Sequence, residues 1–231
     1  MSGQDWSVGD LSLGTNVGSK STRKTWIYVV ALRPERGGHR KVRDRNPRGH
    51  KGRPCVYVGM SGKDPGKAFA GSDFSEAPRE VQRHGRRLLS RHTQYRYSRL
   101  KAVEAKYRLI KDLRDKHYWV FNDSEAKTHS VYVILLSREI QDDPKVTKLN
   151  PDAKRAKPCV YVGQTGKTPK ERLKQHKRGE LANRWVRDHG VRLMPRLYEH
   201  LNPLNELQSL RMERRLARRL RKLGYTVLGG T

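Results

Sequence analysis

Three side chains in the C-terminal half have types and spacing that could carry chemistry: Arg172, His176 and Glu213. Arg172 and His176 are four residues apart, so both lie on one face of a helix that begins shortly before them. Such a pair can belong to a functional site or to a solvated basic face. Taken alone, the pair favours the solvated face, because three lysines lie nearby: Lys170, Lys174 and Lys177.

Glu213 is the most informative of the three residues. A long helix is expected within residues 204–223, and at the helical period its apolar residues form one arc: Leu207, Leu210, Leu216, Ala217, Leu220 and Leu223. Glu213 falls near the middle of that arc, where a buried carboxylate is costly unless it is paired or bound to a metal. A metal ligand and an internal salt bridge to an arginine are both open. The opposite, phosphate-seeking face mostly carries Arg211, Arg214, Arg215, Arg218 and Arg219.

The elements that must position these residues occur twice. Residues 54–65 read PCVYVGMSGKDP, and residues 158–169 read PCVYVGQTGKTP. Tyr28 precedes Tyr57 by 29 residues, as Tyr132 precedes Tyr161, and the offset of 104 between the copies indicates duplication of a whole unit. The glycines of GQTGKT favour a tight turn from strand to helix. A nucleotide phosphate loop is disfavoured, because fewer residues separate these glycines than that motif requires.

Each unit has the pattern β-β-α-β-α-β. The tyrosines lie in β-branched runs that predict two strands, and the linkers between them, residues 33–53 and 137–157, are rich in Pro, Gly and charge and predict loops. A capping box predicts a helix start, with Thr168 as the cap, Pro169 first and Glu171 third. A further strand is expected within residues 93–98 and 191–201, a long helix within 99–116 and 204–223, and a closing strand within 118–122 and 225–228.

These patterns predict an α+β protein with two tandem domains, each a small, mostly antiparallel sheet flanked by helices. Residues 1–23 are rich in Gly and Ser and are expected to form a flexible tail. The first domain is expected at residues 24–123 and the second at 124–231.

The formal net charge of +28 is the strongest global feature. A field of this size attracts a polyanion, most plausibly nucleic acid. No apolar stretch reaches the roughly 18 residues that span a bilayer, and the N-terminus does not have the pattern of a signal peptide. Cys55 and Cys159 are expected to be small core residues in a reducing compartment. We therefore expect a cytoplasmic protein without a membrane partner. The basic residues expected to contact nucleic acid are Arg40, Lys41, Arg43, Arg45, Lys51, Lys167, Lys170 and Lys174.

Taken together, VYV with Tyr132, VYVG with Tyr161, then Arg172, His176 and a late helical Glu213 resemble the GIY-YIG nuclease superfamily. The run RWVRDHGVRLMPRLYEHLNP and the Gly-Gly ending are similar to small stand-alone bacterial members. The resemblance covers residues 128–231 and, more weakly, 24–123. Two departures are visible: the tyrosine strands are unusually far apart, and the family often has an asparagine where this chain has Leu228, Gly229 and Gly230.

The resemblance implies a metal-dependent endonuclease that hydrolyses phosphodiester bonds of nucleic acid, and DNA, not RNA, is the expected substrate. It implies that Glu213 holds Mg²⁺ or Mn²⁺, and that Arg172 neutralises charge on the phosphate. Tyr132, Tyr161 and His176 would position the attacking water and handle its proton, and which of them is the general base stays open. The alternative is a non-catalytic nucleic-acid-binding protein, associated with RNA or the ribosome.

The first copy departs further from the family pattern. At the offset of 104, Ala68 lies opposite Arg172 and Ser72 lies opposite His176. The first copy keeps two tyrosines and two candidate polar residues: Tyr28, Tyr57, Glu104 and Asn122. It therefore has the frame without the phosphate-handling pair, and we expect it to serve as a platform that binds nucleic acid.

Overall fold

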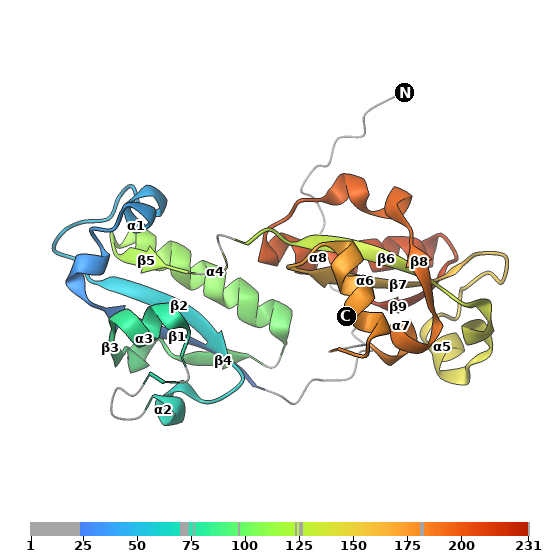
Figure 1. The fold of residues 1–231 in the computed structure, drawn as a ribbon, viewed down its shortest axis with the longest axis horizontal. Coiled ribbons are helices and arrows are strands. Elements are labelled where there is room, and N and C mark those ends of the chain that lie inside the picture. The colour runs from blue at the N-terminus through green and yellow to red at the C-terminus, as the bar shows by residue number, and fades with distance from the viewer. Residues whose placement is uncertain are drawn as a thin grey trace.

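The computed structural model describes residues 24–69, 74–75, 77–96, 98–122, 124, 127–180 and 183–230. Within these residues the chain builds two mixed β-sheets, each flanked by helices (Figure 1), so the predicted α+β class is confirmed. The boundary proposed between residues 123 and 124 falls between the two sheets. The predicted tail at residues 1–23 and the position of Ser72 lie outside the described residues.

The first sheet has the strand order β3-β1-β2-β5, with β4 paired to β1. β1 and β2 are antiparallel, and β5 is parallel to β2. Short 3₁₀ turns lie at Pro34–Arg36 and Ser90–His92. The strands are β1 (Thr25–Leu32), β2 (Cys55–Ser61), β3 (Gly85–Leu88), β4 (Gln94–Arg96) and β5 (Trp119–Phe121), and the helices are α1 (Arg40–Arg45), α2 (Pro65–Ala68), α3 (Arg79–His84) and α4 (Arg99–Asp115).

The second sheet repeats this plan with the strand order β8-β6-β7-β9. The strand expected within residues 191–201 is shorter than predicted and is followed by 3₁₀ turns at Pro195–Leu197 and Glu199–Leu201. A further 3₁₀ segment spans Arg138–Asp142. The strands are β6 (Ser130–Leu136), β7 (Cys159–Thr165), β8 (Gly190–Leu193) and β9 (Thr226–Gly229), and the helices are α5 (Pro144–Leu149), α6 (Pro169–Lys177), α7 (Arg184–His189) and α8 (Glu206–Lys222).

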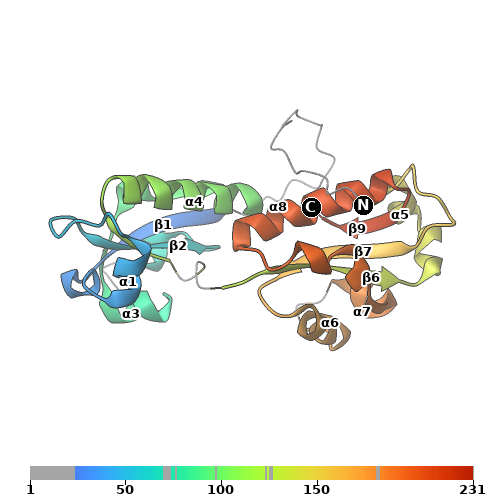
Figure 2. The same cartoon turned by 90° about the horizontal axis from the view of Figure 1, so that it is seen from above.

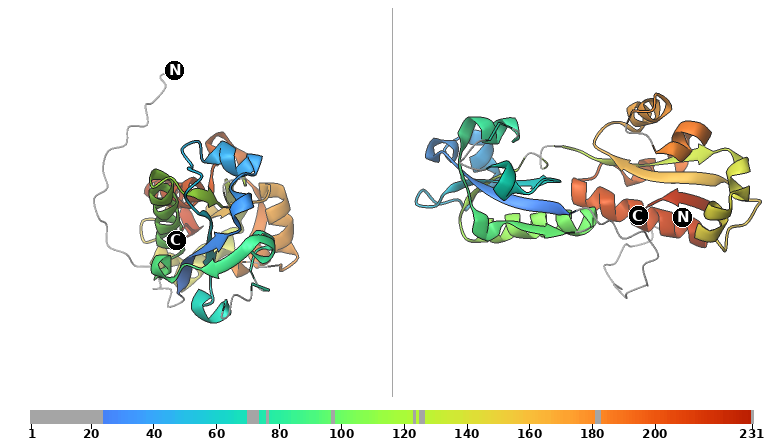
Figure 3. Two further views of the ribbon diagram at one scale, coloured as in Figure 1. Left: turned by 90° about the vertical axis from the view of Figure 1, so that its left-hand side faces the viewer. Right: turned by 90° about the horizontal axis from the view of Figure 1, so that it is seen from below.

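The long helices and the short helices cover opposite faces of the sheets. In Figure 2, α4 and α8 lie on one side, whereas α3, α6 and α7 lie on the other, and the views of Figure 3 agree. Apolar side chains fill the layers between them; Ile27, Val29, Ile110 and Leu113 pack in the first half. No helix of the described residues has the length and apolarity needed to cross a membrane.

The strand register repeats between the halves, but the offset grows along the chain. Tyr28 pairs with Gly59, and Tyr132 pairs with Gly163, which preserves the offset of 104. α4 and α8 are both 17 residues long, and their starts differ by 107 positions. The residue of α4 that corresponds to Glu213 is therefore Lys106. The interpretation of Glu104 as its counterpart is wrong, because the intervening loops of the second half contain three more residues.

The two linkers predicted as loops each contain a short helix, α1 or α5. Asp143 caps α5, where its side chain accepts hydrogen bonds from backbone N–H groups, and a proline occupies the first turn. After each helix a buried asparagine bonds the edge strand of its sheet: Asn46 Oδ1 accepts from Val120 N at 3.0 Å, and Asn150 Oδ1 accepts from Val227 N at 2.9 Å. These contacts order the linkers despite their loop-like composition.

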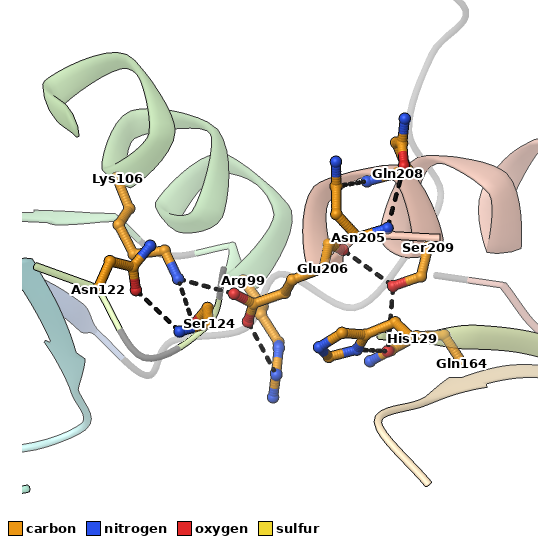
Figure 4. Close-up of polar contacts among 10 residues, drawn as sticks. All are labelled: Arg99, Lys106, Asn122, Ser124, His129, Gln164, Asn205, Glu206, Gln208 and Ser209. Atoms are coloured by element: carbon orange, nitrogen blue, oxygen red, sulfur yellow. Dashed lines mark hydrogen bonds and ion pairs between the residues drawn. The ribbon is translucent and has the colours of Figure 1, made fainter. Parts of the chain in front are cut away.

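The N-terminal parts of α4 and α8 pack against each other and join the two halves (Figure 4). Lys106 Nζ lies 2.7 Å from Glu206 Oε2, and the two side chains are only 3% and 7% exposed. Arg99 lies 3.6 Å from the other oxygen of Glu206. Glu104 and Arg211, which occupy equivalent positions of the two helices, pair at 2.9 Å. The residue expected to be a catalytic remnant is thus part of the junction.

Candidate active site

Strands β6 and β7 place two tyrosines side by side, and α6 adds an imidazole. The ring centres of Tyr132 and Tyr161 are 6.2 Å apart, and the His176 ring lies 6.3 Å from the first and 6.0 Å from the second. Gly163 is required at this point, because a Cβ there would lie 2.6 Å from Tyr132 Oη and 2.8 Å from Tyr161 Cε1. The glycine of the repeated motif therefore makes room for both phenols.

The hydrogen bonds of His176 set its tautomer. The backbone N–H of Asn183, which also caps α7, lies 3.2 Å from His176 Nδ1, so Nδ1 is the acceptor and carries no proton. The proton of the neutral ring is then on Nε2, which lies 3.0 Å from Tyr132 Oη and donates to it. Burial, together with the positive charge of Arg172, lowers the His176 pKa to about 4. His176 is therefore neutral at pH 7 and holds the phenol of Tyr132.

Both tyrosines stay protonated at neutral pH. Burial, with a contribution from Tyr161, raises the pKa of Tyr132 above its ordinary value, and a hydrogen bond from Arg172 opposes this rise. Burial and the carboxylate of Glu213 raise the pKa of Tyr161 to about 12. The two phenols are therefore neutral groups that can orient a water molecule through their O–H bonds.

Glu213 reaches this cluster from α8. Burial raises its pKa to about 7, while a hydrogen bond from the backbone of Gly230 and the charges of Arg214 and Arg99 oppose the rise. Gly230 has φ +73°, and a Cβ there would collide with Ala217, so only glycine brings the backbone this close to α8. A backbone donor thus lies near the place where the resemblance predicts an asparagine.

The sequence left open whether Glu213 forms an internal salt bridge. No residue of the described ranges forms an ion pair with it, although the charges of Arg99 and Arg214 act on its carboxyl group. Arg172 is half-buried on α6, and its charge acts on both tyrosines and on His176. The structure therefore brings all five predicted residues together, with Glu213 available as a ligand.

A divalent metal ion fits this arrangement. The described residues contain no cluster of three or more His, Cys, Asp or Glu side chains that could enclose a metal. Mg²⁺ does not need one, because it keeps several waters and commonly binds through one or two carboxylates and the phosphates of a substrate. Glu213 supplies a hard oxygen donor, and its charge and that of Arg172 both act on Tyr161. Glu213 would hold Mg²⁺ or Mn²⁺.

The equivalent place in the first half is apolar. Tyr28 and Tyr57 keep a ring distance of 6.2 Å, but Phe69 packs 5.2 Å from Tyr28, and Phe74 packs 5.4 Å from Phe69. The positions of Arg172 and Glu213 are taken by Ala68 and Lys106, and the Lys106 side chain points into the junction with α8. Asn122, the other expected remnant, accepts a hydrogen bond from Ser124 N at 3.0 Å beside this junction.

The basic residues predicted to contact nucleic acid fall into two groups. Arg40, Lys41 and Arg43 are exposed on α1, Arg45 is half-buried there, and Lys51 is exposed in the next loop. The second group is exposed at the start of α6 and along it, near the cluster of five residues: Lys167, Lys170 and Lys174. The two groups belong to different sheets (Figure 1). Arg40 also lies 3.9 Å from Asp44, and the negative charge of Asp44 weakens the attraction of Arg40 for a phosphate.

Sequence reasoning missed three contributors to the site. Asn183 precedes a helical pattern and could have been found as an N-cap. The role of the Gly230 backbone and the effect of Arg99 depend on how α8 packs, and no local pattern indicates them. Comparisons of the chain with protein-family models, curated proteins and solved structures find no match. The assignment of the site therefore depends on its own geometry.

Proposed function

We propose that this protein is a metal-dependent endonuclease of the GIY-YIG type that hydrolyses phosphodiester bonds of nucleic acid, with DNA as the expected substrate. One observation carries the proposal: Tyr132, Tyr161, Arg172, His176 and Glu213 converge from four separate elements at one place. A structural ion-pair network would bring charges together as well. It would not need two phenols and an imidazole with perturbed pKa values around a carboxylate that has no ion-pair partner among the described residues.

The roles follow from the contacts. The Arg172 guanidinium binds the scissile phosphate and stabilises the charge that develops on its oxygens. Tyr132 accepts a hydrogen bond from His176 and hydrogen-bonds Tyr161, so the phenol of Tyr161 is held in place and its own O–H proton orients the attacking water. His176 is a positioning residue, because its low pKa and its occupied Nδ1 make it a poor base. A divalent ion on Glu213 would supply Lewis-acid stabilisation and a bound water of lowered pKa.

The net charge of +28 supports a polyanionic substrate. The exposed lysines around α6 border the catalytic cluster and would contact the phosphates on either side of the scissile bond. The proposal includes a cytoplasmic location, with which the two unpaired, buried cysteines Cys55 and Cys159 are compatible.

The test is to incubate the protein with labelled duplex DNA, single-stranded DNA and RNA, in Mg²⁺, in Mn²⁺ and in chelator. We expect metal-dependent cleavage, which is lost in Glu213→Gln although that variant stays folded by circular dichroism. Glu199→Gln is the matched control, because Glu199 is an exposed glutamate on the 3₁₀ turn Glu199–Leu201 of the same half. Binding of these substrates without cleavage under any metal condition would favour the alternative, a non-catalytic nucleic-acid-binding protein.

A further inference from the structure

A basic groove of about 930 Å³ lies in the first half, away from the catalytic cluster. Its walls come from the loop at residues 49–53, the edge strand β3 and the start of β5, which Figure 1 shows at the left-hand end of the molecule with α1. Six of its lining side chains are cationic and none is acidic: Arg43, Lys51, Arg53, Arg86, Arg87 and Arg91. Only Arg43 and Lys51 were expected from the sequence to bind nucleic acid.

The positive charge of the groove is not neutralised within the described residues, where none of the six cations takes part in an ion pair. Arg86, Arg87 and Arg91 are all exposed. Holding six cations around one concave surface is unfavourable for the free protein, because like charges repel. The arrangement is therefore built for a ligand with several negative charges along its length.

The aromatic part of the groove is rigid. Trp119 Nε1 donates to the carbonyl oxygen of His50 at 2.9 Å, and a Cβ on Gly49 would lie 2.6 Å from the indole, so the loop folds tightly against the ring. Tyr118 lies beside Trp119, with the Arg53 guanidinium 5.9 Å from its ring centre. Aromatic side chains interleaved with arginines are typical of surfaces that bind single-stranded nucleic acid.

The second half repeats these features only in part. Four of the six cations and the tyrosine have counterparts there, namely Arg155, Lys157, Arg192, Arg196 and Tyr225. Arg155 is paired with Asp142, and the other positions change: Thr147 corresponds to Arg43, Val191 to Arg86 and Thr226 to Trp119. Gln141 donates a hydrogen bond to Thr226 Oγ1 at 3.1 Å and occupies part of the region that the groove takes in the first half. The duplicated fold therefore does not by itself produce the groove.

We propose that this groove binds a single-stranded segment of nucleic acid, with the cations on its phosphates and the aromatic wall beside its bases. A flexible phosphodiester strand can place its phosphates against several of these cations. The groove volume is near the upper range of small-ligand pockets, so a single strand can enter the groove, whereas a duplex is too wide. An acidic polypeptide offers charge but no base to lie against Tyr118 and Trp119. The inference rests on the proposed function only in taking nucleic acid as the ligand.

The experiment compares two double variants of the full chain at equivalent positions. Arg87→Ala with Arg91→Ala removes two groove cations, and Arg192→Ala with Arg196→Ala removes the same charge from the corresponding β8 edge and turn. Binding of a labelled oligo-dT and of a duplex of equal length is measured in chelator over a range of salt concentrations. Folding of both variants is checked by circular dichroism.

We expect the groove variant to weaken oligo-dT binding and to reduce the slope of log affinity against log salt by about 1.4, at about 0.7 per lost phosphate contact. The β8 variant should leave the oligo-dT slope close to that of the unaltered protein, and duplex binding should differ little between the variants. Three results would overturn the proposal. The first is an equal loss of oligo-dT affinity in both variants, and the second is an equal loss of duplex and oligo-dT affinity in the groove variant. The third is displacement of oligo-dT by polyglutamate as efficiently as by unlabelled oligo-dT.

The two proposals fail separately. Binding is measured in chelator, so it does not need catalysis. Oligo-dT binding that depends on Arg87 and Arg91 in a protein that cleaves nothing would support the groove and overturn the nuclease. Metal-dependent cleavage, with no difference between the two variants in binding, would support the nuclease and overturn the groove.

Discussion

In the second half, Tyr132 and Tyr161 face an imidazole, a guanidinium and a carboxylate, whereas in the first half Tyr28 and Tyr57 face phenylalanines. The basic groove shows the opposite distribution in part: the first half has Arg43, Arg86 and Trp119 where the second half has Thr147, Val191 and Thr226. Both halves keep the same strand order and the same pairing of the tyrosine strands. The comparison shows that the two halves have the same sheet although the side chains that surround it differ in polarity and charge.

The long helices give the clearest example of this exchange. At equivalent positions α8 carries Glu213 and α4 carries Lys106, while Arg99 of α4 corresponds to Glu206 of α8. The reversal of sign lets Lys106 pair with Glu206 across the junction, and it places the charge of Arg99 where it lowers the pKa of Glu213. α4, which carries no residue of the proposed site, therefore contributes charge to α8, which carries Glu213.

The largest expected effect comes from Arg172. Arg172→Ala should lower the cleavage rate of the full chain by about 10²–10³, because the first half has Ala68 at the equivalent position and cannot replace the lost charge. Binding should change little, since one of 51 lysines and arginines is removed. Nicking rates and gel-shift affinities measure the two effects. Robust cleavage that disappears only when Tyr28 is also replaced would assign catalysis to the first half.

The next effect concerns the junction. Lys106→Met should destabilise the protein by about 3–5 kcal/mol, because it leaves the nearly buried carboxylate of Glu206 without its close partner. Burial by itself would raise the pKa of Glu206, but Lys106, Ser124 and Arg99 together outweigh burial and keep this pKa below its ordinary value. The double variant with Glu206→Leu should recover much of this loss in urea unfolding. Additive losses in the double-mutant cycle would show that the two residues are not coupled.

A smaller effect should appear in the pH dependence of the stability of the folded protein. Because the pKa of Glu213 is raised to about 7 in the folded protein, the folded state binds more protons than the unfolded state between about pH 4.5 and 7. Stability of the metal-free protein should therefore fall as pH rises through this window, by roughly 1–3 kcal/mol from this residue. Glu213→Gln should raise the melting temperature more at pH 8 than at pH 5. The opposite trend would show a paired carboxylate.

The same titration predicts the pH dependence of cleavage. A proton on Glu213 competes with a divalent cation, so the rate at limiting Mg²⁺ should rise through about pH 7. Higher Mg²⁺ should shift this rise to lower pH, as expected of competition for one group. A rate that does not change between pH 6 and 8 at limiting Mg²⁺ would separate Glu213 from metal binding.

The smallest effect is expected at Arg40. Its side chain is 88% exposed and lies near Asp44, outside the groove that Arg43 lines. Arg40→Ala should therefore leave the salt slope of oligo-dT binding almost unchanged, whereas Arg43→Ala should reduce it by about 0.7. Equal effects of the two substitutions would indicate a diffuse basic surface in place of a groove.

Much of this protein was determined by the sequence alone. The repeated motif predicted both strand pairs, and the capping box at Thr168 and Glu171 predicted the start of α6. The five residues proposed for catalysis were also named from the sequence, through the resemblance of their order and spacing to the GIY-YIG superfamily, and the structure places them together. These features depend on local hydrogen bonding and on the period of side chains along a strand or helix, which a sequence records directly.

Other features were decided only by the tertiary structure. The residue that corresponds to Glu213 is Lys106 and not the expected Glu104. The reason is that loop lengths differ between the halves and change the offset between equivalent residues. The groove combines residues from four separate stretches of the chain, within residues 31–43, 49–55, 86–91 and 118–119. The Lys106–Glu206 pair joins two residues that are 100 positions apart. Which charges become neighbours across such separations is set by how the layers pack, because burial and charge interaction depend on distance in space.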